Sequence, residues 1–372
     1  MDSTLKLPHP VRVGCNDFMV ANTKEQDQMF DHLTAGLELE KCSIDHLLSV
    51  CLSRAPDLYQ HLLSQGMTRH NIWLDLSSKL IPYKFRKLNG NILTTSDVIE
   101  EKLEVTDIGN DIPISYLRPP FKNCYIEFTE SRTSSLIVYN EISGEHILEG
   151  VYLSEVEILP DTEAMDLYIK TKEFPYKLDS SKPLRVLDMM FTGSPIGKSN
   201  VGDDALRMQG FYVQDDDLTV NEQLRFIENT YGKDEDFADD LNYLSSTLKH
   251  MAKVLLFVNC KQYRDTAFNE RQEMEKQVSS IKSPAKLRKF NKKLRKSYNR
   301  LIIKPEDHVV YKSDDKNKHS DNHEPKKAHW RKGHFRMQPY GAGASRRKVI
   351  YIEPTIVGGL FADKKSYNVR EK

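Results

Sequence analysis

Apolar residues in the first 70 positions recur at helical spacing. After Ser43, which can cap a helix, they stand at positions 44, 47, 48, 51 and 52, the pattern of one buried helix face. Pro56 fits the first turn of a second helix that Gly66 ends, and the apolar residues of 29–37 fit a preceding helix. We therefore predict that residues 1–70 form an N-terminal helical segment whose role is packing.

The spacing changes to two from about Ile72. Ile72, Leu74 and Leu76 alternate along the chain, a pattern typical of a strand. Short β-rich runs, separated by turn signals, follow at 124–128, 136–139, 151–159, 165–169 and 184–188. They predict an antiparallel sheet with one face on helices, within an α+β body that spans residues 71–280. An extended peptide can add to a free edge of such a sheet, which we expect in 124–159.

Two further helices complete the predicted body. Thr219 and Glu222 can form a capping box ahead of Leu224 and Ile227. A longer helix then carries an apolar stripe at positions 237, 241, 244, 248, 251, 255 and 258. We expect this stripe to pack on the sheet, with a coiled-coil partner as the alternative.

Residues 282–300 form a predicted basic amphipathic helix. They contain nine cations and no acid, with apolar residues at helical spacing. Nucleic acid, an anionic membrane surface or an acidic partner are all suitable ligands for such a helix. Nucleic acid is favoured, because no lipidation signal or large apolar face accompanies the charges.

The net charge of zero hides a polarity along the chain. Residues 281–372 hold 25 of the 54 Lys+Arg but only 9 of the 54 Asp+Glu, so the rest of the chain is acidic. This division is typical of a protein that meets nucleic acid at one end, with RNA or the ribosome ahead of DNA. The alternative is that the basic segment docks on the acidic body of the same molecule. Residues 281–328 thus divide into the basic helix and a polar linker at 312–327, which we expect to be mobile.

Composition excludes several classes of protein. No apolar run approaches the roughly 18 residues that a membrane span needs, and residues 1–13 lack a secretory signal core. The five cysteines are scattered and never in C-x-x-C spacing, which argues against a disulfide framework or a cysteine-based zinc site. We therefore expect a cytoplasmic protein with no membrane contact.

Three motifs suggest chemistry only weakly. Gly193–Ser199 resembles a phosphate-binding loop but is one residue short, so a turn is expected. His319 and His323 have metal-ligand spacing but lie in the linker without a nearby cysteine. Asp215–Asp217 is most simply an acidic turn. We predict no metal and no cofactor.

Residues 329–372, a basic tail that ends in a short strand, concentrate the candidate chemistry. Its cations and those of the basic helix are suited to phosphate groups, and Trp330, Phe335 and Tyr340 to base stacking. The predicted nucleic-acid-binding residues are Arg288, Lys292, Arg295, Arg331, Lys332, His334, Arg336, Arg346 and Arg347. The enzymatic alternative is a metal-independent ribonuclease that uses His329 and His334 as acid and base, which requires a turn at Gly333.

The tail resembles a known family. The pattern of His329, Arg331, Gly333, His334, Phe335 and Arg336, followed by Gly341, Gly343, Arg347 and the strand 351–354, is similar to the C-terminus of type V-A anti-CRISPR proteins of the A-two class. Phages and plasmids encode these proteins. The order of segments is similar too, although this chain is longer and has Phe335 where tryptophan is typical.

The resemblance implies a mode of action. Members of this family lower the amount of the CRISPR effector nuclease by recognising its N-terminal polypeptide as it leaves the ribosome, with loss of the encoding mRNA. By analogy, the body would bind a nascent polypeptide in the bacterial cytoplasm and the basic tail would contact RNA or the ribosome. The ribonuclease described above and a plain RNA- or DNA-binding regulator remain the alternatives.

Overall fold

The computed structural model describes ten stretches of the chain, and all structural statements below refer to them. They are residues 7–14, 23–128, 137–140, 144–170, 178–195, 205–214, 218–231, 238–260, 263–305 and 329–357.

Helices dominate the N-terminal part, as predicted. They are α1 (His9–Gly14), α2 (Thr23–Leu33), α3 (Ile44–Arg54), α4 (Pro56–Ser64) and α5 (Arg69–Lys87). The Ser43 hydroxyl accepts a hydrogen bond from the His46 N–H (3.3 Å) and caps α3, while Pro56 begins α4. The two sequence signals for helix starts are therefore confirmed.

Two predicted strands are helices, so those predictions were wrong. Residues 72–76 belong to α5, where Ile72, Leu76 and Leu80 are buried at a spacing of four. Residues 165–169 lie in α8 (Glu163–Lys170), which buries Met165 and Tyr168 at a spacing of three. In both cases the apolar run was too short for its period to separate a strand from a helix face.

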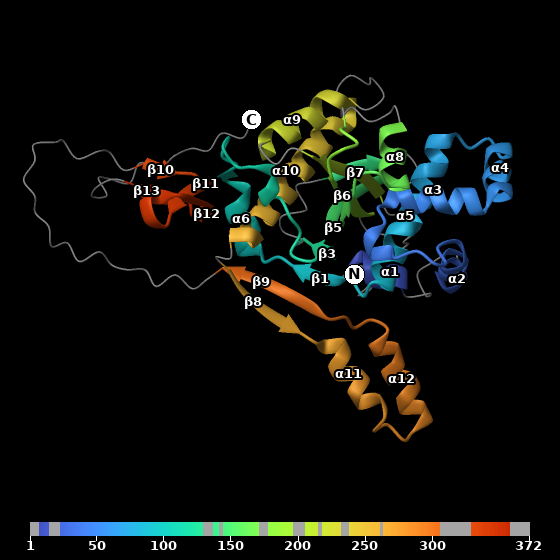
Figure 1. Ribbon diagram of the computed structural model, residues 1–372. Helices are drawn as coiled ribbons and strands as arrows, with labels where there is room; N and C mark the ends of the chain where they lie inside the picture. The colour runs from blue at the N-terminus through green and yellow to red at the C-terminus, as the bar shows by residue number, and fades with distance from the viewer. Residues whose placement is uncertain are drawn as a thin grey trace, which may run out of the picture.

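The main sheet has the order β7-β6-β5-β3-β1-β9-β8, with β4 paired to β5 (Figure 1). Its strands are β1 (Asn91–Thr94), β3 (Asn123–Glu127), β4 (Ile137–Asn140), β5 (Gly144–Ile158), β6 (Leu184–Pro195), β7 (Ala205–Val213), β8 (Tyr263–Phe268) and β9 (Arg300–Pro305). The antiparallel run β3-β5-β6 agrees with the predicted meander, and β7, which was not predicted, extends it. In contrast, β1 pairs in parallel with both β3 and β9. The sheet is therefore mixed.

Within 124–159, the strands β3 and β5 are interior, and β4 is the one described strand there that has a side without a described partner strand. β3 pairs with β1 and β5, and β5 pairs with β3 and β6, so both strands are interior. Among the described strands, β7 and β8 end the main path of the sheet, and β4, which pairs only with β5, has a further free side.

Helices cover both faces of the sheet. α6 (Asp97–Glu104), α9 (Val220–Tyr231) and α10 (Ala238–Cys260) share one core with the sheet, and α3 and α5 share another. The predicted capping box of α9 is present, because the Thr219 N–H donates to Glu222 Oε2 (2.8 Å) and the Glu222 N–H donates to Thr219 Oγ1 (3.2 Å). The apolar stripe of α10 packs on the sheet, as expected, through Leu248, Met251 and Leu255.

The predicted basic helix is shorter than expected. α12 (Pro284–Leu294) pairs with α11 (Glu270–Val278) in a helical hairpin, and the chain enters β9 at Arg300. The β8–β9 ribbon carries this hairpin, here called the arm, away from the body (Figure 1). None of the helices that the structure describes is long and apolar enough to span a membrane.

The C-terminal tail is more structured than the single short strand expected from the sequence. It contains β10 (His329–Arg331), β11 (Gly333–Tyr340), β12 (Arg346–Ile352) and β13 (Thr355–Val357). β11 pairs antiparallel with β12 and parallel with β2 (Thr106–Asp107) of the body, and β10 pairs with β13. The α+β class is confirmed, and the β11–β12 unit, here called the basic hairpin, is part of the folded body.

Candidate nucleic-acid interface

Apolar side chains anchor the basic hairpin to the body. Phe335 is 1% exposed, and Val349 and Tyr351 are also buried in the core that contains α10. Phe257 of α10 packs edge-on against Tyr351, with ring centroids 5.4 Å apart. Phe335, which we expected to be available for base stacking, instead belongs to the core.

Close packing explains the glycine of the tail motif. A Cβ on Gly333 would lie 2.6 Å from Thr106 Oγ1 and 3.0 Å from Pro354 Cδ, so a larger residue would push β11 away from β2. The Thr106 hydroxyl donates to the Lys102 carbonyl (2.7 Å) and lies 3.3 Å from the Tyr351 hydroxyl. Gly333, Phe335 and Tyr351 therefore have structural roles.

The cations of the basic hairpin point away from this anchor. Residues 340–348 are all exposed, as are Arg331, Lys332 and Arg336. Lys332 lies 4.0 Å from Asp107, but both side chains are about 70% exposed, so this pair contributes little. Arg336 donates to Gln338 Oε1 (2.7 Å).

Four arginines in or next to the basic hairpin are not neutralised by an ion pair with a described carboxylate. Within the described residues no carboxylate lies within 4.0 Å of the guanidinium groups of Arg331, Arg336, Arg346 and Arg347. The basic segment does dock on the acidic body, as one alternative held, but it docks through apolar contacts. The charges remain exposed to solvent.

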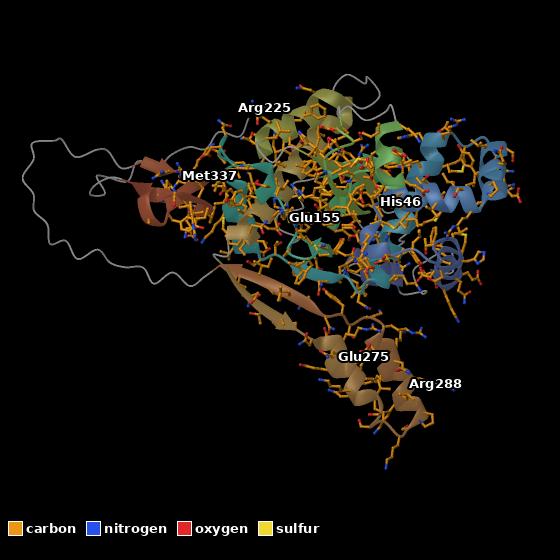
Figure 2. All side chains as sticks on the ribbon, viewed as in Figure 1. His46, Glu155, Arg225, Glu275, Arg288 and Met337 are labelled. Carbon is orange, nitrogen blue, oxygen red and sulfur yellow. The ribbon has the colours of Figure 1, made fainter. Side chains whose placement is uncertain are left out.

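The arm presents a second basic surface. Lys286, Arg288, Lys289, Lys292 and Lys293 are exposed on α12, and Arg295 is exposed at its C-terminal end. Neither helix of the arm contains a buried residue, because Leu287, Phe290 and Leu294 are only half-buried against α11. Figure 2 labels Glu275 on α11 and Arg288 on α12, at the end of the arm far from the hairpin residue Met337.

The two histidines predicted as an acid–base pair, His329 and His334, lie on strands of two different sheets. His334 Nδ1 lies 3.5 Å from the Lys332 carbonyl, and Nε2 lies 3.4 Å from Arg331 Nη2. Neither partner is an acid or base that can act together with an imidazole. His329 stands in β10, which pairs with β13 and belongs to a separate sheet, and Gly333 lies in a strand without a left-handed turn.

The weaker motifs lie partly or wholly outside the described residues. Gly193, Ser194 and Pro195 form the end of β6, where a turn was expected, and 196–199 are not described. Asp215–Asp217, His319, His323 and the linker at 312–327 are also outside. Within the described ranges, no cluster of His, Cys, Asp or Glu side chains has the arrangement of a metal site.

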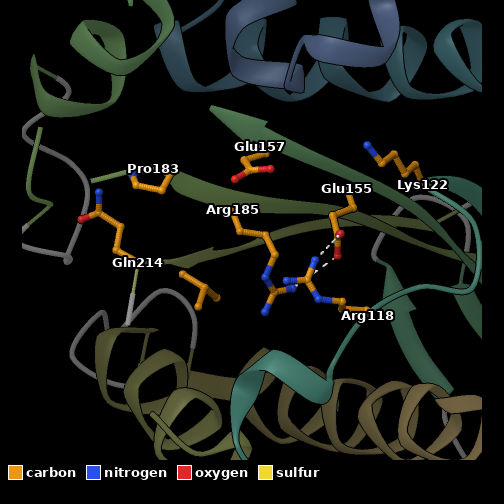
Figure 3. Close-up of a pocket in the computed structure, with 8 residues that line it drawn as sticks. Arg118, Lys122, Glu155, Glu157, Pro183, Arg185 and Gln214 are labelled. Atoms are coloured by element: carbon orange, nitrogen blue, oxygen red, sulfur yellow. Dashed lines mark hydrogen bonds and ion pairs between the residues drawn. The ribbon is translucent and has the colours of Figure 1, made fainter. Parts of the chain in front are cut away.

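A polar cavity of about 190 Å³ lies where β5 and β7 end and β6 begins (Figure 3). Glu155 accepts hydrogen bonds from Arg118 (2.9 Å) and Arg185 (3.3 Å). Arg185 also donates to the carbonyls of Leu117 and Ile114, at 3.0 Å each. This buried guanidinium therefore ties the 114–117 segment to the sheet.

Sequence reasoning missed a buried charged cluster on the other face of the sheet. Lys84 is 1% exposed, and its ammonium donates to the Cys42 carbonyl (2.6 Å) and to Ser154 Oγ (2.7 Å). Burial, and then the neighbouring Asp45, raise the pKa of Asp188 to about 7, while burial lowers the pKa of Lys84. The available signal was a lysine inside the apolar run 80–85 and an aspartate inside the strand 184–191.

Comparison with known proteins gives three results. The model of the AcrVA2-like family, described as the anti-CRISPR type V subtype A2 family, matches residues 94–359. A solved structure, the crystal structure of AcrVA2, is similar at 14% identity and a TM-score of 0.45, over 95% of this chain and 99% of that one. No curated protein matches the chain significantly.

Proposed function

This chain belongs to the AcrVA2-like family of type V subtype A2 anti-CRISPR proteins, and on that premise we propose that it binds a target polypeptide during synthesis. Binding lowers expression of the target through loss of its mRNA. The candidate target is the nascent effector nuclease of a type V CRISPR system. The protein acts in the cytoplasm of a bacterial host, encoded by a phage or plasmid.

The observation that carries the RNA-binding part is a set of four uncompensated arginines, one at the end of β10 and three on the basic hairpin. Arg331, Arg336, Arg346 and Arg347 are exposed and have no described carboxylate within ion-pair distance. Guanidinium groups bind phosphate bidentately, and exposed clusters of them attract polyanions. Because the hairpin is anchored in the core, these groups have a fixed position on the body.

The arm is a second basic surface that supports the same proposal. Its helix α12 carries Lys286, Arg288, Lys289, Lys292 and Lys293 with no acidic residue. A projecting basic helix is suited to the phosphate backbone of RNA, including ribosomal RNA. The hairpin and the arm are far apart, so one extended RNA or a ribosomal surface fits both better than a short oligonucleotide does (Figure 1).

Removal of the four arginine charges tests the proposal. The variant Arg331→Ala, Arg336→Ala, Arg346→Ala, Arg347→Ala is expected to keep its thermal unfolding profile and to lose the reduction of target mRNA in cells that co-express a type V effector. The matched control removes four exposed cations elsewhere, by Lys41→Ala, Lys170→Ala, Lys182→Ala and Lys249→Ala, and should retain activity. Full activity of the arginine variant would contradict a role of the hairpin in RNA contact.

A further inference from the structure

Strand β7 forms an edge of the main sheet. It pairs with β6 from Ala205 to Val213, and no other described strand pairs with it. The side-chain amide of Gln209 donates to the Gly210 carbonyl of the same strand (3.0 Å). Gln209 Oε1 is buried without a hydrogen-bond partner among the described residues. Backbone groups at such an edge are a template for an extended peptide.

A small cavity opens beside this edge, between β7 and the helices α3 and α5. Its volume of about 20 Å³ accommodates one water-sized group. Aromatic and thioether side chains form much of its wall, and two carboxylates and the Gln209 amide supply polar groups. The lining residues are Ile44, Asp45, Trp73, Ile81, Asp188, Met189, Met208, Gln209, Gly210 and Tyr212.

The two carboxylates hold fixed positions. Asp45 Oδ1 accepts from the Trp73 indole N–H (3.0 Å), and Oδ2 accepts from the Tyr212 hydroxyl (3.5 Å). Asp188 Oδ2 accepts from the Ile44 N–H (2.9 Å). Hydrogen bonds from α3, α5 and β7 thus hold both groups in place beside the same small cavity.

This cluster has more acidic than basic groups. Lys84 is the described cation nearest to it, and the Lys84 ammonium donates to Cys42 and Ser154 instead of to either carboxylate. Burial raises the pKa of both Asp45 and Asp188, and the positive charge of Lys84 opposes the rise at Asp188 without cancelling it. A buried carboxylate is stabilised when a cation comes within hydrogen-bond distance.

We propose that β7 binds an extended peptide as an added strand and that the adjacent cavity receives the ammonium group of a lysine side chain of that peptide. An ammonium is water-sized and fits the cavity, whereas the larger guanidinium of arginine does not. Trp73 and Tyr212 add aromatic surface that favours a cation. The inference deepens the proposed function, on which it rests, because it assigns the bound segment of the target polypeptide to this edge.

Fluorescence of Trp73 tests the site directly. The chain contains two tryptophans, so Trp330→Phe leaves Trp73 as the single reporter. Three blocked octapeptides of alternating threonine and valine, which differ in one central residue (lysine, norleucine or arginine), are titrated against the full chain. The lysine peptide is expected to bind at least tenfold more tightly than the other two and to change the Trp73 emission.

Two variants and one control complete the test. Asp45→Asn should reduce the affinity for the lysine peptide at least tenfold, while Asp166→Asn, which removes an exposed carboxylate on α8, should leave it unchanged. If Asp45→Asn does not fold, Met208→Lys provides a second test, because an internal ammonium at the edge should compete with the peptide. Equal affinity for the lysine and norleucine peptides, or an Asp45→Asn or Met208→Lys protein that binds like the parent, would overturn the inference.

The same proteins separate this inference from the proposed function. If the parent protein captures the nascent target from translating extract and Asp45→Asn captures it equally well, the edge site is wrong and the proposed function stands. If the lysine peptide binds as expected but the parent protein lowers no target mRNA, the proposed function is wrong and the edge site stands.

Discussion

Lys102 Nζ of α6 lies 2.7 Å from Glu353 Oε1, a contact between residues 251 positions apart that ties the end of the basic hairpin to the body. Both side chains are about 30% exposed, so solvent screens the pair and its contribution to stability is small. In a double-mutant cycle with Lys102→Ala and Glu353→Ala, we expect a coupling energy below about 1 kcal/mol from denaturant unfolding. A coupling of several kcal/mol would mean that the ion pair, and not the apolar anchor, holds the hairpin.

The apolar anchor should carry most of the energy. Phe335→Ala is expected to lower the free energy of unfolding by about 3–5 kcal/mol, because it leaves a cavity in the core shared with α10. The neighbouring Arg336→Ala removes an exposed side chain and should change it by less than about 0.5 kcal/mol. Urea titration of both variants measures these changes in the free energy of unfolding. Equal changes would mean that Phe335 does not pack in the core of the body.

Stability should also depend on pH through Asp188. In the folded protein the pKa of Asp188 is about 7, so this group keeps a proton that the unfolded chain releases near the ordinary pKa of 3.8. The associated stability is present below that lower value and is lost as the pH rises toward 7. Asp188→Asn has no such proton, so it should gain stability relative to the parent by up to about 1.4 kcal/mol per pH unit between pH 4 and 7.

Asp166→Asn, on the surface of α8, is the control for this titration. Its stability should follow the parent at every pH. An Asp188→Asn curve that runs parallel to the parent would show that Asp188 is ionised throughout this range.

The salt dependence of RNA binding should report the exposed arginines. Each phosphate contact to a single strand contributes about 0.7 to the slope of log affinity against log salt concentration. Arg347→Ala is therefore expected to lower that slope by about 0.7, while Lys170→Ala on α8 leaves it unchanged. The measurement is a filter-binding or anisotropy titration at several salt concentrations.

Purified protein is expected to bind labelled RNA in EDTA without cutting it. The His334 ring contacts Arg331 and the Lys332 carbonyl, which suits binding of phosphate better than proton transfer. Cleavage in EDTA that His334→Ala abolishes would establish the ribonuclease alternative. Cleavage that persists in His334→Ala would point to a contaminating nuclease.

Much of the secondary structure could be predicted because local signals agreed with it. Ser43, Pro56 and the Thr219–Glu222 pair mark helix starts in both the sequence and the structure. The strands predicted at 72–76 and 165–169 are helices, because three alternating apolar residues are too few to distinguish the period of a strand from that of a helix. Packing against the sheet stabilises both helices.

The site was harder to predict for a physical reason. Phe335 lies among cations, a context in which an aromatic residue suggests base stacking, yet long-range packing in the core that contains α10 buries it. Lys84 and Asp188 each lie in an apolar run, which is a local sign of burial, but the residues that enclose them come from distant parts of the chain. Arg336, which follows the buried Phe335 on β11, is exposed because successive side chains of a strand point to opposite faces.

The basic hairpin shares its core with the sheet whose edge is β7, and this has a geometric consequence. The distance between the exposed arginines of the basic hairpin and that edge is therefore fixed by the fold. Any partner that touches both places at once must present its own two features at that spacing, so recognition depends on distance as well as on chemistry.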